Sequence, residues 1–189
     1  MARLQYFRGH CLDVPELETK KGDRPMFPKF KMEKNGKFYI DDKYISNGHW
    51  MVVKNRINPY SQVFKALKEG FLAKNGTHPT GIHPDPIPGT PDMGYVIPTR
   101  DGYQRLSEEA TCARISVNDQ ILGYGFSFGD RTVYIAPEYV PLIRLGQAFA
   151  KTETGAVIVL DSDDLNGELI AVVMPKRFND KKEEEKNAS

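Results

Sequence analysis

The stretch from Arg131 to Phe178 constrains the fold more strongly than any other part of this chain. Residues 131–135 have the β-branched and aromatic composition of a strand, and Pro137 suits the first turn of a helix. Asn166-Gly167 favours a tight hairpin between two later aliphatic runs. The predicted elements are strands at Arg131–Ile135, Ala156–Asp161 and Glu168–Met174 and a helix that begins at Pro137. This order predicts an α+β fold with antiparallel sheet.

Two helices are predicted, and each has one apolar face. The later helix extends from Pro137 through Phe149, and the earlier one begins at Asn58-Pro59 and fades near Asn75-Gly76. Their apolar side chains recur at helical spacing: Val63, Phe64, Leu67, Phe71 and Leu72 in the first, and Tyr139, Leu142, Ile143, Leu145 and Phe149 in the second. We therefore expect both helices to pack on the antiparallel sheet.

Further strands are predicted before each helix. In the first half, Asn35-Gly36 suits a type I′ turn between two strand-like runs, and another strand follows at Trp50–Lys54. In the second half, strands are predicted at Thr111–Val117 and Gln120–Phe128. The chain thus contains two similar runs of strands that lead into a helix, which indicates a weak internal repeat.

Composition divides the chain into one domain and its appendages. Residues 1–29 are predicted to be an N-terminal extension, and residues 30–178 a single domain. Residues 76–98 are so rich in proline and glycine that we expect an insertion without helix or strand. Residues 179–189 are dominated by charge and are predicted to be a disordered tail.

The overall composition narrows the classes of partner. Hydrophobic residues make up 40% of the 189 residues, which is enough for a core. Lys and Arg total 26 against 25 for Asp and Glu, so the net charge is only +1 and no global basic field draws the chain to DNA or to an anionic membrane. Contact with nucleic acid would have to come from a local basic face.

The cysteines and the N-terminal residues predict a cytoplasmic protein. Cys11 and Cys112 are far apart and lack CxxC spacing, which favours two free thiols in a reducing compartment. A single disulfide bridge is the alternative. Arg3 and Arg8 interrupt the apolar residues near the start, so neither a signal peptide nor a membrane span is predicted there.

Three segments of the second half occur in a familiar order. They are the strand-to-helix step Tyr134–Ile143, the strand with an acidic end at Val157–Asp164, and the closing run Ala171-Val172-Val173-Met174-Pro175-Lys176-Arg177-Phe178. Their order and spacing resemble the end of the last domain of a bacterial DNA sliding clamp, the β subunit of the replicative polymerase. Clamps close with Met-Pro-x-Arg and an apolar residue. Asn47-Gly48-His49 is similar to the clamps' Thr-Asp-Gly-His-Arg-Leu step, although Asn replaces Asp and Trp50 stands where Arg is usual.

The resemblance implies a sliding-clamp-like domain of repeated strand–helix–strand units, with helices facing a ring's channel and sheets outside. It also implies a hydrophobic pocket for short peptides of replication proteins. The candidate peptide-binding residues by this match are His49, Trp50, Met51, Met174, Pro175 and Arg177. Clamp subunits contain three such domains, so a ring of this chain would be a homo-oligomer of several copies. The insertion at 76–98 and the residues beyond Phe178 depart from the clamp pattern.

Each candidate contact also has a plainer explanation. Trp50 suits a core anchor slightly better than an exposed contact, Met174-Pro175 can simply end a strand, and Arg177 can be a surface charge. The candidates for nonspecific contact with double-stranded DNA are Lys65, Lys68 and Lys74 on the first helix and Arg144 and Lys151 on the second. An ordinary solvated helix face explains these basic residues equally well.

No catalytic constellation is recognised in the sequence, so we expect no enzyme activity and no cofactor. A phosphate-binding loop, a nucleophile elbow and a Cys–His pair are all missing from it. The polar residues of the insertion that a metal would need, His78, His83, Asp85 and Asp92, match no strong ligand spacing. Asp161, Asp163 and Asp164 are better explained as a solvated hairpin.

Two hypotheses remain, with a distant third. The first is a non-enzymatic clamp-like scaffold on DNA, or a docking module for replication peptides, of phage or mobile-element type. The second keeps the fold without DNA binding and makes the domain a protein–protein interaction or regulatory module that uses its Pro-rich loop. The third is a metal-dependent hydrolase that uses the loop histidines. Fold resemblance alone does not decide among them.

Overall fold

A computed structural model of the chain describes residues 38–58, 60–75, 86–115 and 120–178. Side chains within 71–75 lie outside this description. The predicted N-terminal extension at 1–29, the turn at Asn35-Gly36 and the charged tail at 179–189 also lie outside the described residues.

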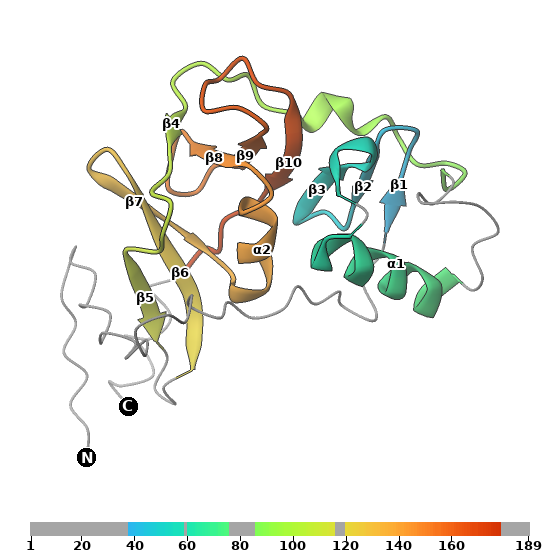
Figure 1. The fold of residues 1–189 in the computed structure, drawn as a ribbon, viewed down its shortest axis with the longest axis horizontal. Helices are drawn as coiled ribbons and strands as arrows, with labels where there is room; N and C mark the ends of the chain where they lie inside the picture. The colour runs from blue at the N-terminus through green and yellow to red at the C-terminus, as the bar shows by residue number, and fades with distance from the viewer. Residues whose placement is uncertain (1–37, 59, 76–85, 116–119, 179–189) are drawn as a thin grey trace, which may run out of the picture.

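The described residues form two antiparallel sheets, as expected for an α+β protein (Figure 1). The larger sheet has seven strands in the order β1-β2-β3-β10-β9-β8-β4, and the smaller has three in the order β5-β6-β7. The strands of the larger sheet are β1 (Tyr39–Ile40), β2 (Tyr44–Ser46), β3 (Trp50–Val53), β4 (Gln104–Arg105), β8 (Gln147–Ala150), β9 (Val157–Leu160) and β10 (Leu169–Val173). Those of the smaller sheet are β5 (Cys112–Ile115), β6 (Ile121–Phe128) and β7 (Arg131–Ile135).

The first helix, α1 (Gln62–Asn75), ends where the sequence predicts but begins a few residues later. The Ser61 hydroxyl accepts a hydrogen bond from the Phe64 N–H at 3.0 Å, so serine caps the first turn in place of the predicted asparagine. Helix α1 lies beneath β1–β3 (Figure 1), and its Val63 and Leu67 are buried in the same core cluster as Ile45 of β2. No described helix is both long and apolar enough to cross a membrane.

The second helix is much shorter than predicted. A 3₁₀ turn at Pro137–Tyr139 leads into α2 (Val140–Ile143), and the chain then enters β8. The helix predicted through Phe149 is therefore wrong, because residues 147–149 pair with β9. A Cβ atom at Gly146 would overlap the Leu160 carbonyl oxygen, so the close approach of these two backbones requires glycine between α2 and β8.

The larger sheet is buried on both faces. Trp50, Val159 and Val173 point to an inner face that packs against both helices and the smaller sheet. Side chains on neighbouring positions point the opposite way, as the pleat requires, and Met51 and Val172 lie in a second cluster on the outer face. This double burial explains why β9 is apolar along its whole length.

The outer face is covered by residues 93–103, here called the outer cover. The cover includes the end of the predicted insertion, and it contains a 3₁₀ turn at Met93–Val96 where no helix was expected. Met93 is buried, and its N–H donates to the Asp41 carboxylate at 3.0 Å. The Ile87 N–H also donates to the Ile40 carbonyl at 2.8 Å. This part of the insertion is thus attached to the sheet.

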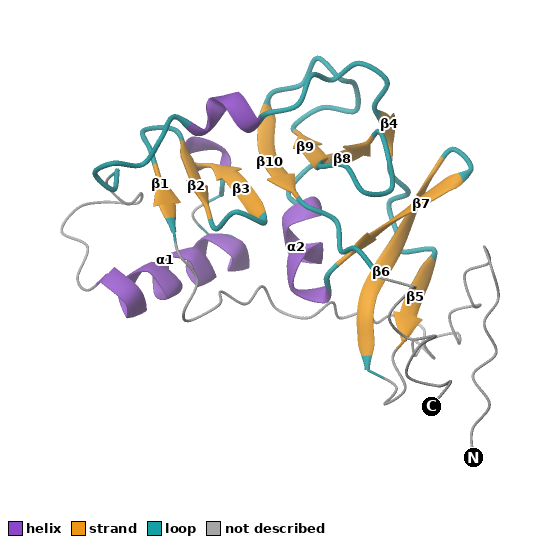
Figure 2. Cartoon of the chain, turned by 180° about the vertical axis from the view of Figure 1, so that it is seen from behind, coloured by secondary structure: helices purple, strands orange, loops and turns teal. Residues whose placement is uncertain are grey.

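The residues after β10 connect the two sheets. The chain crosses from the larger sheet to the smaller one, where the Lys176 N–H donates to the Tyr134 carbonyl at 2.8 Å (Figure 2). The Phe178 ring meets the Tyr134 ring edge-on at 5.4 Å, and the Arg114 guanidinium lies 4.2 Å from its centre. The residues after β10 therefore have a structural role in this chain.

The outer cover supplies a pH-dependent contact at Tyr103. Its hydroxyl donates to the Ala156 carbonyl at 3.0 Å, and burial raises the pKa of the Tyr103 phenol. The unfolded chain loses this proton first, near pH ~10. The contribution of the neutral phenol to stability is therefore complete below that pH and is lost as the pH rises through the higher pKa of the folded state.

We expect Tyr103→Phe to lower the free energy of unfolding by about 1 kcal/mol at pH ~8, because one hydrogen bond is lost. The difference from the wild type should narrow above pH ~10, since only the wild type then loses stability through this phenol. Urea denaturation of both proteins at about pH 8 and above about pH 10 measures this difference in the free energy of unfolding. Tyr60→Phe is the control, because Tyr60 is 95% exposed. A difference that stays constant with pH would contradict the buried neutral phenol.

Candidate functional site

The segments around His49 and Met174, from which the sequence predicted peptide contacts, lie side by side in the larger sheet. Trp50 of β3 pairs with Val173 of β10, and the Met174 N–H donates to the His49 carbonyl at 2.8 Å. His49 and Met174 are thus cross-strand neighbours at one end of the sheet. Directly opposed side chains share a face, so both belong to the outer face.

The six predicted peptide-binding residues differ in accessibility. His49 and Arg177 are exposed and Met174 is half-buried, whereas Pro175 is buried. Trp50 and Met51 each retain only 3% exposure and pack on opposite faces of the sheet. Trp50 is therefore in the core. Of the six residues, His49, Met174 and Arg177 have accessible side chains. The Arg177 guanidinium donates a hydrogen bond to the Thr154 carbonyl at 3.5 Å.

A hairpin turn at Asn47-Gly48 sets the position of His49. The Asn47 side chain accepts hydrogen bonds from the N–H groups of His49 at 3.0 Å and Trp50 at 3.1 Å. Gly48 has φ +88°, a conformation that glycine adopts without a steric penalty. The β2–β3 hairpin was not predicted, although Asn-Gly is the signal that could have found it.

The structure does not gather the basic candidates on one face. Lys65 and Lys68 are exposed on α1, and Lys65 lies 3.9 Å from Glu69. The side chain of Lys74 lies outside the described residues. Arg144 follows α2, and Lys151 follows β8 and lies near Gly102. The two residues are therefore not on one helix, contrary to the sequence prediction. Figures 1 and 2 both place α1 beneath β1–β3 and β8 toward the other end of the sheet.

The acidic hairpin between β9 and β10 is held by ion pairs and backbone bonds. Asp161 accepts from the Glu168 N–H at 2.7 Å, and Arg56 contacts both carboxylates. The Arg100 guanidinium, partly buried, donates to the carbonyls of Leu165 at 2.5 Å and Gly167 at 2.6 Å. These contacts give the hairpin a structural explanation, and the arginines were not predicted from the sequence.

The metal hypothesis falls mostly outside the described residues. His78, His83 and Asp85 lie there, and Asp92 accepts from the Gly94 N–H at 2.8 Å. Among the described residues, no three His, Cys, Asp or Glu side chains are close enough to hold a metal ion. Cys112 is disulfide-bonded, which is the alternative to the free thiol expected from the sequence, and its partner lies outside the described residues.

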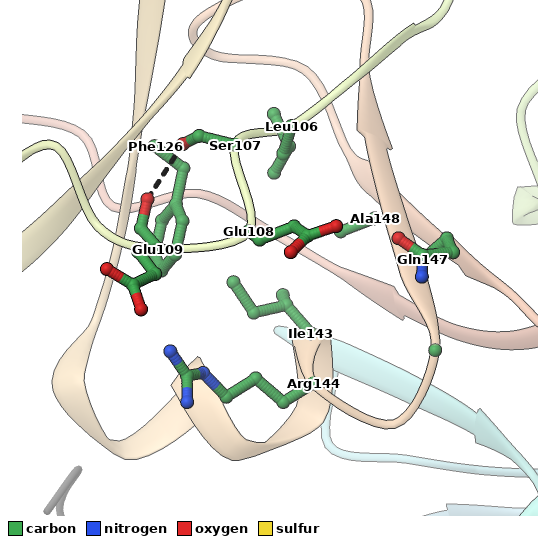
Figure 3. A pocket seen from close by; sticks show the side chains of 10 residues that line it. Leu106, Ser107, Glu108, Glu109, Phe126, Ile143, Arg144, Gln147 and Ala148 are labelled. Atoms are coloured by element: carbon green, nitrogen blue, oxygen red, sulfur yellow. Dashed lines mark hydrogen bonds between the residues drawn. The ribbon is translucent and has the colours of Figure 1, made fainter. Parts of the chain in front are cut away.

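A pocket of about 400 Å³ lies between the two sheets (Figure 3). Its apolar side chains are Leu106, Phe126, Ile143 and Ala148, and its polar residues are Ser107, Glu108, Glu109, Arg144 and Gln147, with Gly146 at one wall. Sequence reasoning missed this site, except for naming Arg144 as a DNA contact. The residues come from separate segments with no shared motif, so no sequence signal was available.

Comparisons of the chain with protein families, with curated proteins and with solved structures found no match.

Proposed function

We propose that this chain is a non-enzymatic docking module of the sliding-clamp kind, which binds short peptides of replication proteins at the β3–β10 end of its larger sheet. The observation that carries the proposal is the hydrogen bond between the Met174 N–H and the His49 carbonyl, at 2.8 Å. It joins the only two segments for which a clamp resemblance suggests peptide contact.

The accessible side chains there suit a short peptide. Met174 is half-buried and offers a flexible apolar contact that adapts to different side chains. His49 is exposed beside it, and Arg177 is exposed three residues further along the chain. Both side chains can bind a peptide carboxylate or backbone carbonyl. Trp50 and Met51 are buried on opposite faces of the sheet and hold β3 in place.

Peptide docking is favoured over a scaffold around DNA. The basic candidates are dispersed over both ends of the larger sheet, and the net charge of the chain is only +1. A ring of the clamp kind would also require several copies of the chain. The alternative is an interaction or regulatory module of the same fold that binds another class of protein and no DNA.

Fluorescence anisotropy with labelled peptides from the clamp-contacting segments of bacterial replicative polymerases tests the docking proposal. We expect binding by the wild type, and roughly tenfold weaker binding by Met174→Ala and by Arg177→Gln, as for loss of an interface contact of ~1.4 kcal/mol. Lys43→Ala is the control, because Lys43 is exposed in the β1–β2 turn.

Two results would count against peptide docking. One is no binding of any peptide together with salt-dependent retention of DNA that Lys65→Glu and Lys68→Glu abolish, which would favour the DNA scaffold. The other is equal peptide affinity for the wild type and both variants. Light scattering would separately test the ring, since a strict monomer at high concentration excludes it without affecting the docking module.

A further inference from the structure

The pocket between the sheets forms because one segment changes its pairing partner. The Leu106 N–H donates to the Ala148 carbonyl of the larger sheet at 2.8 Å, and the next residue, Ser107, donates to the Ser127 carbonyl of the smaller sheet at 2.8 Å. The sheets separate at this point. Ile143 and Arg144, at the end of α2, close the opening from the other side.

The floor of the pocket is apolar and rigid. Leu106, Phe126 and Ile143 retain between 1% and 5% exposure, so the core fixes their positions. A volume of about 400 Å³ is at the lower end of the range for small-molecule sites, which is about 300–1,000 Å³. The pocket therefore suits one small ligand with an apolar body.

The rim carries charges of both signs, and its charged side chains lie on two sides of the opening. Figure 3 shows the Glu109 carboxylate and the Arg144 guanidinium facing each other on one side, and the Glu108 carboxylate beside Gln147 on the other. Glu108 also accepts a hydrogen bond from Arg105 at 2.9 Å. Among the lining residues Glu108 and Glu109 are acidic and Arg144 is basic, and Arg105, just outside the lining, offsets the charge of Glu108, so neither a polyanion nor a polycation complements the rim.

The environment of Arg144 indicates what a ligand must supply. The pocket wall removes part of the water around the guanidinium and lowers the pKa of Arg144, while the Glu109 carboxylate raises it. A wholly apolar ligand would remove more water from both charges without replacing their hydrogen bonds, which is costly. A carboxylate toward Arg144 and an ammonium toward Glu109 would replace them.

We propose that this pocket binds a zwitterionic α-amino acid with a large apolar side chain. The side chain lies on Leu106, Phe126 and Ile143. The α-carboxylate meets the Arg144 guanidinium, and the α-ammonium meets the Glu109 carboxylate that faces it. The site is separate from the docking surface at His49 and Met174 and does not depend on it.

Titration of the ¹⁵N-labelled full chain with four small molecules, followed by NMR, tests this proposal. L-phenylalanine has both charges and the ring, 3-phenylpropanoate lacks the ammonium, phenethylamine lacks the carboxylate, and glycine lacks the ring. We expect L-phenylalanine to shift the amide signals of Gly146 and Gln147, and to bind about tenfold more tightly than each of the others, because each lacks one charged or apolar contact.

Arg144→Gln and Glu109→Gln should each weaken L-phenylalanine binding about tenfold. Both side chains are exposed at the rim, so the spectra of these variants should otherwise match the wild type. Glu153→Gln, exposed in the turn after β8, is the control. Absence of binding, equal affinity for all four molecules, or unchanged affinity in Arg144→Gln would overturn the proposal.

Discussion

Trp50→Ala is expected to lower the free energy of unfolding by about 3–5 kcal/mol, the usual cost of truncating a large buried aromatic side chain. Trp50 retains 3% exposure and belongs to the core cluster on the inner face of the larger sheet. Its loss would leave a cavity beside Val52 and Val173, which the paired strands cannot readily close. Urea denaturation followed by circular dichroism measures the change.

His49→Ala is the matched control for Trp50→Ala, because the two residues are adjacent in the chain but differ in burial. His49 is exposed, and its replacement should change stability by less than about 0.5 kcal/mol. A Trp50→Ala variant that kept wild-type stability but lost peptide binding would show that Trp50 is a contact side chain. The core assignment would then be wrong.

The elements that the sequence predicted well have strong local signals. The run 157–160 is aliphatic and β-branched, and Asn166-Gly167 separates it from a similar run, so β9 and β10 follow from composition and turn chemistry alone. Helix α1 follows from the spacing of Val63 and Leu67, and both side chains are buried. In these segments local preference and tertiary packing agree.

The elements that were missed depend on a partner strand. Gln104 and Arg105 are both exposed, so β4 has no alternating pattern and exists only through its pairing with β8. Phe149 stands at helical spacing from the apolar residues of α2, yet it points to the outer face from a strand. The apolar residues of such short segments fit the spacing of a helix as well as that of a strand, and tertiary contacts decide which of the two forms.

The candidate sites were predictable to different degrees. The clamp-like residues were named from the sequence, but the pairing that sets His49 beside Met174 depends on the order of strands in the sheet. The pocket could not be predicted at all. It depends on a change of partner between Leu106 and Ser107, and nothing in the local sequence marks that step.

Gly146→Ala is expected to lower the free energy of unfolding by about 1–3 kcal/mol, as overpacking does in a rigid interior. The added methyl group would overlap the Leu160 carbonyl oxygen and would meet the Ile170 side chain at 2.7 Å. The backbone of β9 cannot move away without breaking its pairing with β8 and β10. Thermal and urea denaturation measure the loss.

Gly94→Ala separates this steric effect from the general effect of replacing glycine. A Cβ atom at Gly94 would have as its nearest neighbour a carboxylate oxygen of Asp92 at 3.1 Å, and that side chain can shift by a few tenths of an ångström. Its stability should stay within about 0.5 kcal/mol of the wild type. Alanine also favours helix over glycine. If Gly146→Ala were as stable as the wild type and gained helical signal in circular dichroism, α2 would continue toward Phe149, and β8 would not be the preferred state of residues 147–150.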